Sequence, residues 1–201
     1  MNLLDLIFPK TCLSCGQEGK YICDGCLAKV RRCGMRQEAF SVFRYEGVIR
    51  KAIITLKYKY STEIAKELAD LCIRNLKSAN LATKNYLLIP IPLYWHRQNI
   101  RGFNQSEEVG KLVAKGMNWK YEPNLLVKKI STKPQVGLKS ITRSSNLKDV
   151  FSLNSNYSLL PIRCPLVLFD DVFTTGSTIR EAAKVLKHAG FKRIWGITIA
   201  R

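Results

Sequence analysis

The sequence predicts an α/β domain in which a parallel β-sheet is flanked by helices, preceded by a small cysteine-rich segment. The first observation is that buried-strand patterns alternate with helix patterns over the C-terminal part of the chain, as in parallel sheets with both faces covered. The second is that four cysteines cluster near the N-terminus. A length of 201 residues suits one domain with a small appendage. We therefore expect a cysteine segment over residues 1–38 and a main domain over residues 39–201.

Four of the seven cysteines form two Cys-x2-Cys pairs, Cys12 with Cys15 and Cys23 with Cys26. Four thiolates at this spacing suit a tetrahedral structural zinc ion, which would stabilise a segment too small to bury a core of its own. The alternative is a set of four reduced or redox-active thiols. Cys33 begins a third pair that lacks its second cysteine, so it predicts no second metal site.

The residues after the cysteine segment predict one strand and two helices. Alternation of apolar and polar residues over 40–45 indicates a strand, and apolar residues at helical spacing over 48–56 indicate a helix. Ser61 is a good N-cap for the second helix, whose apolar face includes Ile64 and Leu68.

From residue 86 onward the pattern alternates between strands and helices. A short apolar strand over 86–92 ends in prolines, and a capping-box pattern over 104–107 begins a helix. A second apolar strand, over 166–169, leads through a turn into another helix, and residues 193–200 form a last strand. This order is the reason for expecting a parallel sheet.

The charge balance is strongly positive. The chain has 33 Lys and Arg residues against 15 Asp and Glu residues, a formal net charge of +18. A hydrophobic content of 46% excludes wholesale disorder. The positive excess predicts a polyanionic partner, either nucleic acid, an anionic membrane surface or a phosphorylated small molecule. The apolar runs are too short to span a bilayer and no signal peptide is recognisable, so we expect a cytoplasmic protein.

The most informative residues follow the strand 166–169. Asp170 and Asp171 stand at its carboxyl end, the edge at which open α/β sheets bind ligands. The next turn contains Thr174, Thr175, Gly176, Ser177 and Thr178. It enters a helix N-terminus, where backbone N–H groups and the helix dipole favour phosphate. Carboxylates instead accept hydrogen bonds from vicinal hydroxyls or bind Mg²⁺. The pattern therefore predicts a sugar-phosphate site, with an acidic strand end and an ordinary Ser/Thr turn as the alternative.

Residues 166–178 resemble the thirteen-residue signature of type I phosphoribosyltransferases, and the whole chain resembles the ComF family of competence-associated proteins. The second resemblance includes the cysteine pairs, Tyr45-Glu-Gly-Val-Ile-Arg50, Leu56-Lys-Tyr58, Ile89-Pro-Ile-Pro-Leu93, Arg101-Gly-Phe-Asn-Gln105, Thr132-Lys-Pro-Gln135, Arg143-Ser-Ser-Asn146 and Ile199-Ala-Arg201. It implies a type I phosphoribosyltransferase-like fold with a site for 5-phosphoribosyl 1-pyrophosphate and Mg²⁺. In such a site Asp170 and Asp171 would hold the ribose hydroxyls, and the turn 174–178 would hold the 5′-phosphate.

The resemblance also implies where the pyrophosphate would be bound. The turn after Pro92 corresponds to a pyrophosphate loop, with Arg97 and Arg101 as its nearest cations. Residues from about 130 to 146 correspond to a loop that closes over the site, carrying Lys133, Lys139 and Arg143. Loss of pyrophosphate leaves an oxocarbenium-like sugar, so catalysis needs cations at the leaving group and exclusion of water. The catalytic candidates are Asp170, Asp171, Lys133 and Arg143.

Two functions are compatible with these features. In the first, the protein is a zinc-bearing phosphoribosyltransferase with an unidentified acceptor that, by its resemblance to ComF, handles incoming single-stranded DNA during natural transformation. In the second, it is a nucleic-acid-binding or adaptor protein whose sugar-phosphate site is regulatory or vestigial, and whose partners are DNA or competence proteins such as a helicase or recombination mediator. The run 57–60 interleaves cations with aromatic rings that could stack on bases, although a solvated helix end explains it equally well.

Overall fold

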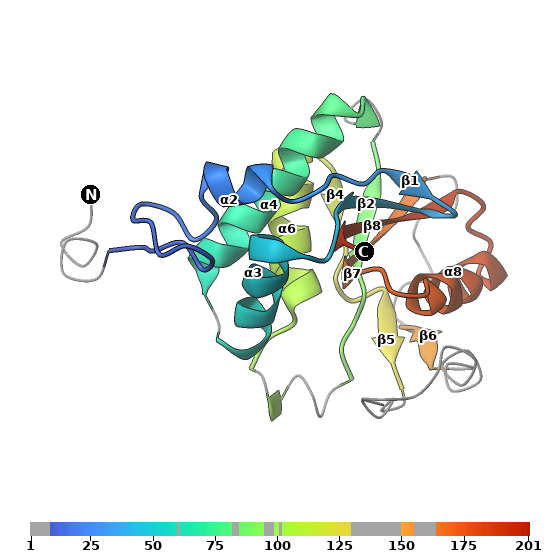
Figure 1. Cartoon of the computed structure of the whole chain (residues 1–201). Helices are drawn as coiled ribbons and strands as arrows, with labels where there is room; N and C mark the ends of the chain where they lie inside the picture. Colours follow the sequence, from blue (N-terminus) through green and yellow to red (C-terminus); the bar gives the residue numbers. More distant parts are fainter. Residues whose placement is uncertain are drawn as a thin grey trace.

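The computed structural model describes residues 9–59, 61–81, 85–94, 99–100, 102–129, 150–154 and 164–201. Among them, the main element is a six-stranded sheet with strand order β1-β2-β8-β7-β3-β4. All neighbouring strands are parallel except β1 and β2 (Figure 1). The strands are β1 (Met35–Arg36), β2 (Ala39–Phe43), β3 (Leu87–Pro90), β4 (Lys120–Tyr121), β7 (Leu166–Val172) and β8 (Ile194–Ala200). This confirms the predicted α/β class with a mostly parallel sheet.

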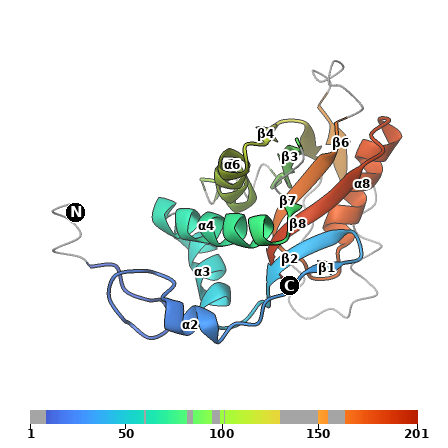
Figure 2. The same ribbon diagram turned by 90° about the horizontal axis from the view of Figure 1, so that it is seen from above.

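Helices cover both faces of this sheet. Among the described residues, the helices with at least twelve residues are α3 (Gly47–Tyr58), α4 (Thr62–Ser78), α6 (Gln105–Met117) and α8 (Ser177–His188). Figure 2 shows α3, α4 and α6 on one side and α8 on the other. A small antiparallel pair, β5 (Leu126–Lys128) and β6 (Phe151–Leu153), packs into the apolar cluster on the α8 side. Because helices pack on both faces, residues 166–169 of β7 are completely buried.

The predicted caps of two helices are present. The Ser61 hydroxyl accepts a hydrogen bond from the backbone N–H of Ile64 at 3.3 Å, which begins α4 as expected. Asn104 caps α6, but its side chain accepts from the N–H of Ser106 at 3.1 Å and not from Glu107, as a capping box would require. Its amide group also donates to the carbonyl of Ile91 at 3.0 Å. This second bond connects the start of α6 to the chain leaving β3.

The direction of the chain through the sheet diverges between β3 and β7. From β3 the chain passes through α6 to β4, whereas from β7 it passes through α8 to β8, on the opposite side. Open α/β sheets bind ligands beyond the carboxyl ends of strands at such a point of divergence. The acidic pair at the end of β7 and the turn before α8 therefore occupy the predicted ligand-binding edge.

The cysteine segment rests on the helices of the main domain. Its short helix α2 (Asp24–Ala28) lies beside α3, and Ile22 and Val30 belong to the same apolar cluster as residues of α3 and α4 (Figure 2). The carboxylate of Glu67, on α4, accepts hydrogen bonds from the N–H groups of Tyr21 at 3.0 Å and Ile22 at 2.8 Å. The segment is thus fixed by both apolar and polar contacts, while the boundary at residue 38 stays a prediction.

In the described part of the chain, none of the helices has the length and apolar character needed to cross a bilayer.

Candidate functional site

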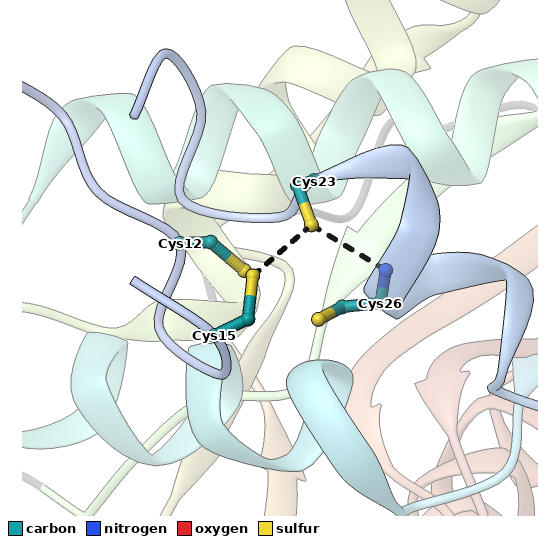
Figure 3. A group of neighbouring side chains, drawn as sticks. All are labelled: Cys12, Cys15, Cys23 and Cys26. Atoms are coloured by element: carbon teal, nitrogen blue, oxygen red, sulfur yellow. Dashed lines mark hydrogen bonds between the residues drawn. The ribbon is translucent and has the colours of Figure 1, made fainter. Parts of the chain in front are cut away.

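The four predicted metal ligands converge on one point. The sulfur atoms of Cys12, Cys15, Cys23 and Cys26 all lie within 4.8 Å of one another (Figure 3). The Sγ atoms of Cys15 and Cys23 are 3.6 Å apart, close to the roughly 3.8 Å expected between thiolates at the corners of a zinc tetrahedron. Local turns set this arrangement, since Gly16 adopts a φ of 77° and its N–H donates to the carbonyl of Cys12 at 2.9 Å. The donor set therefore fits a structural zinc ion.

The electrostatics of the cluster also favour a cation. Burial opposes ionisation of Cys12, but hydrogen bonds from the backbone of Cys15, Cys23 and Ser14 lower its pKa to about 6. Hydrogen bonding to Cys15, together with burial, raises the pKa of Cys26 to about 12. Protein groups by themselves therefore do not stabilise four thiolates at this spacing, whereas a divalent metal would.

The acidic pair at the end of β7 contacts two helices. The hydroxyl of Ser106, on α6, donates to Oδ1 of Asp170 at 3.1 Å, and the backbone N–H of Asp171 donates to the same oxygen at 2.9 Å. Lys57, on α3, places its Nζ 2.7 Å from Oδ2 of Asp171. Both members of this ion pair are largely buried, with side-chain exposures of 25% for Lys57 and 15% for Asp171. The pair of carboxylates is thus held by elements on the same face of the sheet.

The two carboxylates occupy different electrostatic environments. Burial and the neighbouring charge of Asp171 raise the pKa of Asp170 to about 7, although the hydrogen bonds and Lys57 oppose this shift. Burial disfavours the charged form of Lys57, but the Asp171 carboxylate raises the pKa of the lysine above its usual value. Near neutral pH, Asp170 can therefore exchange a proton at low cost while Asp171 stays in an ion pair.

The turn before α8 has the geometry of an anion-binding loop. Gly176 has a φ of 75°, and a Cβ atom there would lie 2.5 Å from Cζ of Phe173, so the position requires glycine. The hydroxyls of Thr175 and Ser177 lie 2.8 Å apart. In the part of the chain that the structure describes, the backbone N–H groups of Thr174 and Thr178 donate to no protein acceptor. These donors stand at the positive end of the helix dipole.

The structure brings together only part of the predicted site. Asp170, Asp171 and the turn 174–178 lie together at the carboxyl edge of β7. The predicted cations Arg97, Arg101, Lys133, Lys139 and Arg143 lie outside the described residues.

Sequence reasoning missed two residues of this site. The sequence patterns give Lys57 a place only in a run that could stack on DNA bases, and they give Ser106 no role in the site. Their partners are 114 and 64 residues away in the sequence, and no spacing rule connects residues so far apart. The Leu56-Lys-Tyr58 motif was the one signal that could have drawn attention to Lys57.

Comparison with known proteins places the chain in a family. Competence protein F of Haemophilus influenzae is 32% identical over 197 residues, which cover 94% of this chain and 84% of that protein. The chain belongs to the ComF family. This ComF-family chain is also 30% identical to the DNA utilization protein YhgH of Escherichia coli K12, over 77% of its own length and 67% of YhgH. Competence protein ComFC of Bacillus subtilis is 24% identical over 89% of this chain and 72% of ComFC. No family model matches the chain.

Among solved structures, this ComF-family protein is similar to the allosteric regulatory enzyme of purine biosynthesis. The TM-score is 0.45 and the sequence identity is 14%, with 72% of this chain and 29% of that chain covered.

Proposed function

We propose that this protein binds 5-phosphoribosyl 1-pyrophosphate, together with Mg²⁺, at the carboxyl edge of β7, and that it takes part in DNA uptake. The observation that carries the proposal is the placement of Asp170 and Asp171 in the last residues of β7, two residues before a turn rich in hydrogen-bond donors at the start of α8. Carboxylates accept hydrogen bonds from ribose hydroxyls, while the turn suits the 5′-phosphate of the same molecule. The names of the competence relatives support the cellular context.

The acidic pair would bind and orient the sugar. Asp170 would accept a hydrogen bond from one hydroxyl as its proton is released, and Asp171 would accept from the neighbouring hydroxyl while Lys57 limits the repulsion between the two acids. The negative charge near the ribose would stabilise an oxocarbenium-like sugar as the bond between C1 and the pyrophosphate oxygen breaks. The acceptor that forms the new bond to C1 is not identified by any described residue.

Metal ions would have two separate roles. Zinc, held by the four cysteines, would stabilise the fold without access to substrate. Mg²⁺ binds through few carboxylates and mainly through substrate phosphates. This fits a site where Asp171 is already paired with Lys57. When bound, Mg²⁺ would neutralise part of the charge of the pyrophosphate.

The proposal is tested by calorimetric titration with 5-phosphoribosyl 1-pyrophosphate, with and without Mg²⁺. We expect the wild type to bind and the double variant Asp170→Asn/Asp171→Asn to lose most of its affinity. Asp70→Asn is a suitable control, because Asp70 is exposed on α4 and remote in sequence from the turn. Absence of binding by the wild type would reject the proposal.

A nucleic-acid-binding or adaptor function is the second candidate, and the net charge of +18 favours it. Tyr58, 76% exposed at the end of α3, offers a ring on which a base could stack, whereas Lys57 is engaged with Asp171. Binding of a single-stranded oligonucleotide should then weaken steeply with salt, and Tyr58→Ala should reduce it. Sugar binding without pyrophosphate release across a panel of nucleobases and amines would favour this candidate. An absent or salt-insensitive DNA signal would remove it.

A further inference from the structure

A pocket beside the turn before α8 is lined by three arginines. Its volume is about 270 Å³, near the lower end of the roughly 300–1,000 Å³ usual for small-molecule sites. Arg36 belongs to β1, Arg44 follows β2, and Arg201 follows β8. These strands are neighbours in the sheet, so three residues that are distant in the sequence meet in one place. Thr174 and Thr175 form another part of the wall.

These arginines form no direct ion pairs among the described residues, although the charge of Arg44 also acts on the Glu46 carboxylate. Nearby Arg31 differs, since its guanidinium contacts the Glu46 carboxylate at 3.0 Å. Three cations that are not in ion pairs, around one pocket, create a positive potential that attracts anions.

Arg201 gives the strongest indication of a missing partner. Its Nε and Nη1 atoms are buried and have no hydrogen-bond acceptor in the protein. The backbone of Arg201 is held in place, because its N–H donates to the carbonyl of Phe43 at 3.0 Å and its carbonyl accepts from Tyr45 at 2.7 Å. Burying a guanidinium without an acceptor is costly. An anion in the adjoining pocket would lie beside this unbalanced charge and offset its cost.

A fourth arginine fixes the turn next to this pocket. The Nη2 of Arg180, on α8, donates to the carbonyl of Thr175 at 2.7 Å, and its Nη1 donates to the side-chain oxygen of Gln37 at 3.2 Å. Gln37 directly follows Arg36 and also lines the pocket. Arg180 therefore acts as a positioning residue that holds the turn against the hairpin of β1 and β2.

We propose that Arg36, Arg44 and Arg201 form a subsite for a phosphate monoester, next to the donors of the turn. A guanidinium binds a phosphate dianion through charge-assisted N–H···O bonds, and three guanidinium groups around one pocket can share its oxygens. If the phosphate belongs to the sugar bound by Asp170 and Asp171, the subsite deepens the proposed function and rests on it. If the phosphate belongs to a separate small molecule, the subsite is independent of the acidic pair.

The first test is titration with ribose 5-phosphate and with inorganic phosphate. Charge-assisted hydrogen bonds of this kind should make Arg201→Met bind at least about tenfold more weakly than the wild type. Arg201→Lys keeps the charge but loses the planar guanidinium, so its affinity should lie between those of the wild type and Arg201→Met. Arg74→Met removes an equal charge from the exposed surface of α4 and should leave the affinity unchanged. Equal affinities of Arg201→Met and Arg74→Met would overturn the proposal.

A second readout does not depend on the proposed sugar ligand. Without phosphate, Arg201→Met should unfold at the same or a higher temperature than the wild type, because a buried unpaired charge is removed. Added phosphate should then raise the unfolding midpoint of the wild type but not of Arg201→Met. A stabilisation by phosphate that is the same in both proteins would count as an adventitious effect and would contradict the subsite.

Competition between ligands separates the two sources of the phosphate. Displacement of ribose 5-phosphate by 5-phosphoribosyl 1-pyrophosphate would assign the subsite to the sugar, and simultaneous binding of both would assign it to a separate ligand. Failure of the proposed function is distinguishable from failure of this inference. If the proposed function fails, Asp170→Asn/Asp171→Asn leaves the binding of 5-phosphoribosyl 1-pyrophosphate intact. If this inference fails, Arg201→Met leaves the binding of ribose 5-phosphate and inorganic phosphate intact.

Discussion

At the scale of single residues, Asp170 has the most unusual environment of the described acids. It follows the completely buried residues 166–169 of β7 and lies beside a second carboxylate; its own burial and the neighbouring charge both favour its neutral form. Ser106 and the N–H of Asp171 both donate to the same carboxyl oxygen. The site therefore keeps an acid near the midpoint of its titration at neutral pH, which has consequences for stability.

The substitution Asp170→Asn should change the pH dependence of folding. The pKa of Asp170 is raised from 3.8 to about 7 in the folded state. Its contribution to stability is therefore fully present below pH 4 and is lost as the pH rises through about 7. Since Asn does not titrate, the variant should not show this loss. The unfolding free energy of the variant minus that of the wild type should therefore increase from pH 4 to pH 7. Denaturant unfolding of both proteins across this range measures the difference, and parallel curves would contradict the assignment.

At the scale of elements, the turn before α8 depends on backbone conformation. Gly176→Ala would place a Cβ atom 2.5 Å from Phe173 and 2.9 Å from Nη1 of Arg180, at a φ of 75°. We expect a loss of roughly 1–3 kcal/mol in unfolding free energy together with weaker phosphate binding.

Gly34→Ala is a matched control for this change. A Cβ atom there meets no atom within 4 Å, and the residue does not have a positive φ. Thermal unfolding and phosphate titration of both variants check the prediction. Comparable behaviour of the two alanine variants would show that the turn tolerates a side chain.

A second prediction at this scale concerns the junction between the cysteine segment and α4. Glu67→Gln keeps the side-chain shape but replaces one acceptor oxygen by an amide that faces the backbone N–H of Tyr21 or Ile22. The loss should be about 1–3 kcal/mol and should increase hydrogen exchange over residues 20–26. Glu63→Gln breaks a more exposed ion pair with Lys10 and should cost under about 1 kcal/mol. The prediction fails if both variants exchange at the same rate.

At the scale of the whole molecule, the cysteine cluster is coupled to the main apolar core. Cys12, Cys23, Ile22 and Val30 are buried in the same cluster as residues of α3, α4 and α6. Removal of the metal would separate thiolates that repel one another and would disturb this shared core. The effect should therefore extend beyond the N-terminal segment.

We expect about one zinc ion per chain by elemental analysis, as four converging thiolates form one tetrahedral site. Chelation of the metal, or the substitution Cys12→Ser, should lower the midpoint of thermal unfolding of the full chain. Cys164→Ser is a control outside the cluster. A metal content far below one per chain, or an unchanged midpoint after chelation, would contradict a structural zinc site.

Much of the architecture was predictable because its signals are local. The apolar run 166–169 and the helical spacing after it are patterns of a few residues, and both elements form, although β7 continues through the two acids to Val172. The short strands β1, β4, β5 and β6 have two or three residues each, too few for a periodic pattern. They form because neighbouring strands supply hydrogen-bond partners. These partners are distant in the sequence, so a local pattern carries no information about them.

The sequence by itself determined the two sets of chemically active groups that lie close together along the chain. These are the four cysteines, within residues 12–26, and the acids with the following turn, within residues 170–178. Tertiary structure alone decided which distant residues surround them. Lys57 and Ser106 reach the acids from two helices, and Arg36, Arg44 and Arg201 meet because β1, β2 and β8 are adjacent. Such contacts depend on strand order and helix packing, which place residues by position in space and not by spacing in the sequence.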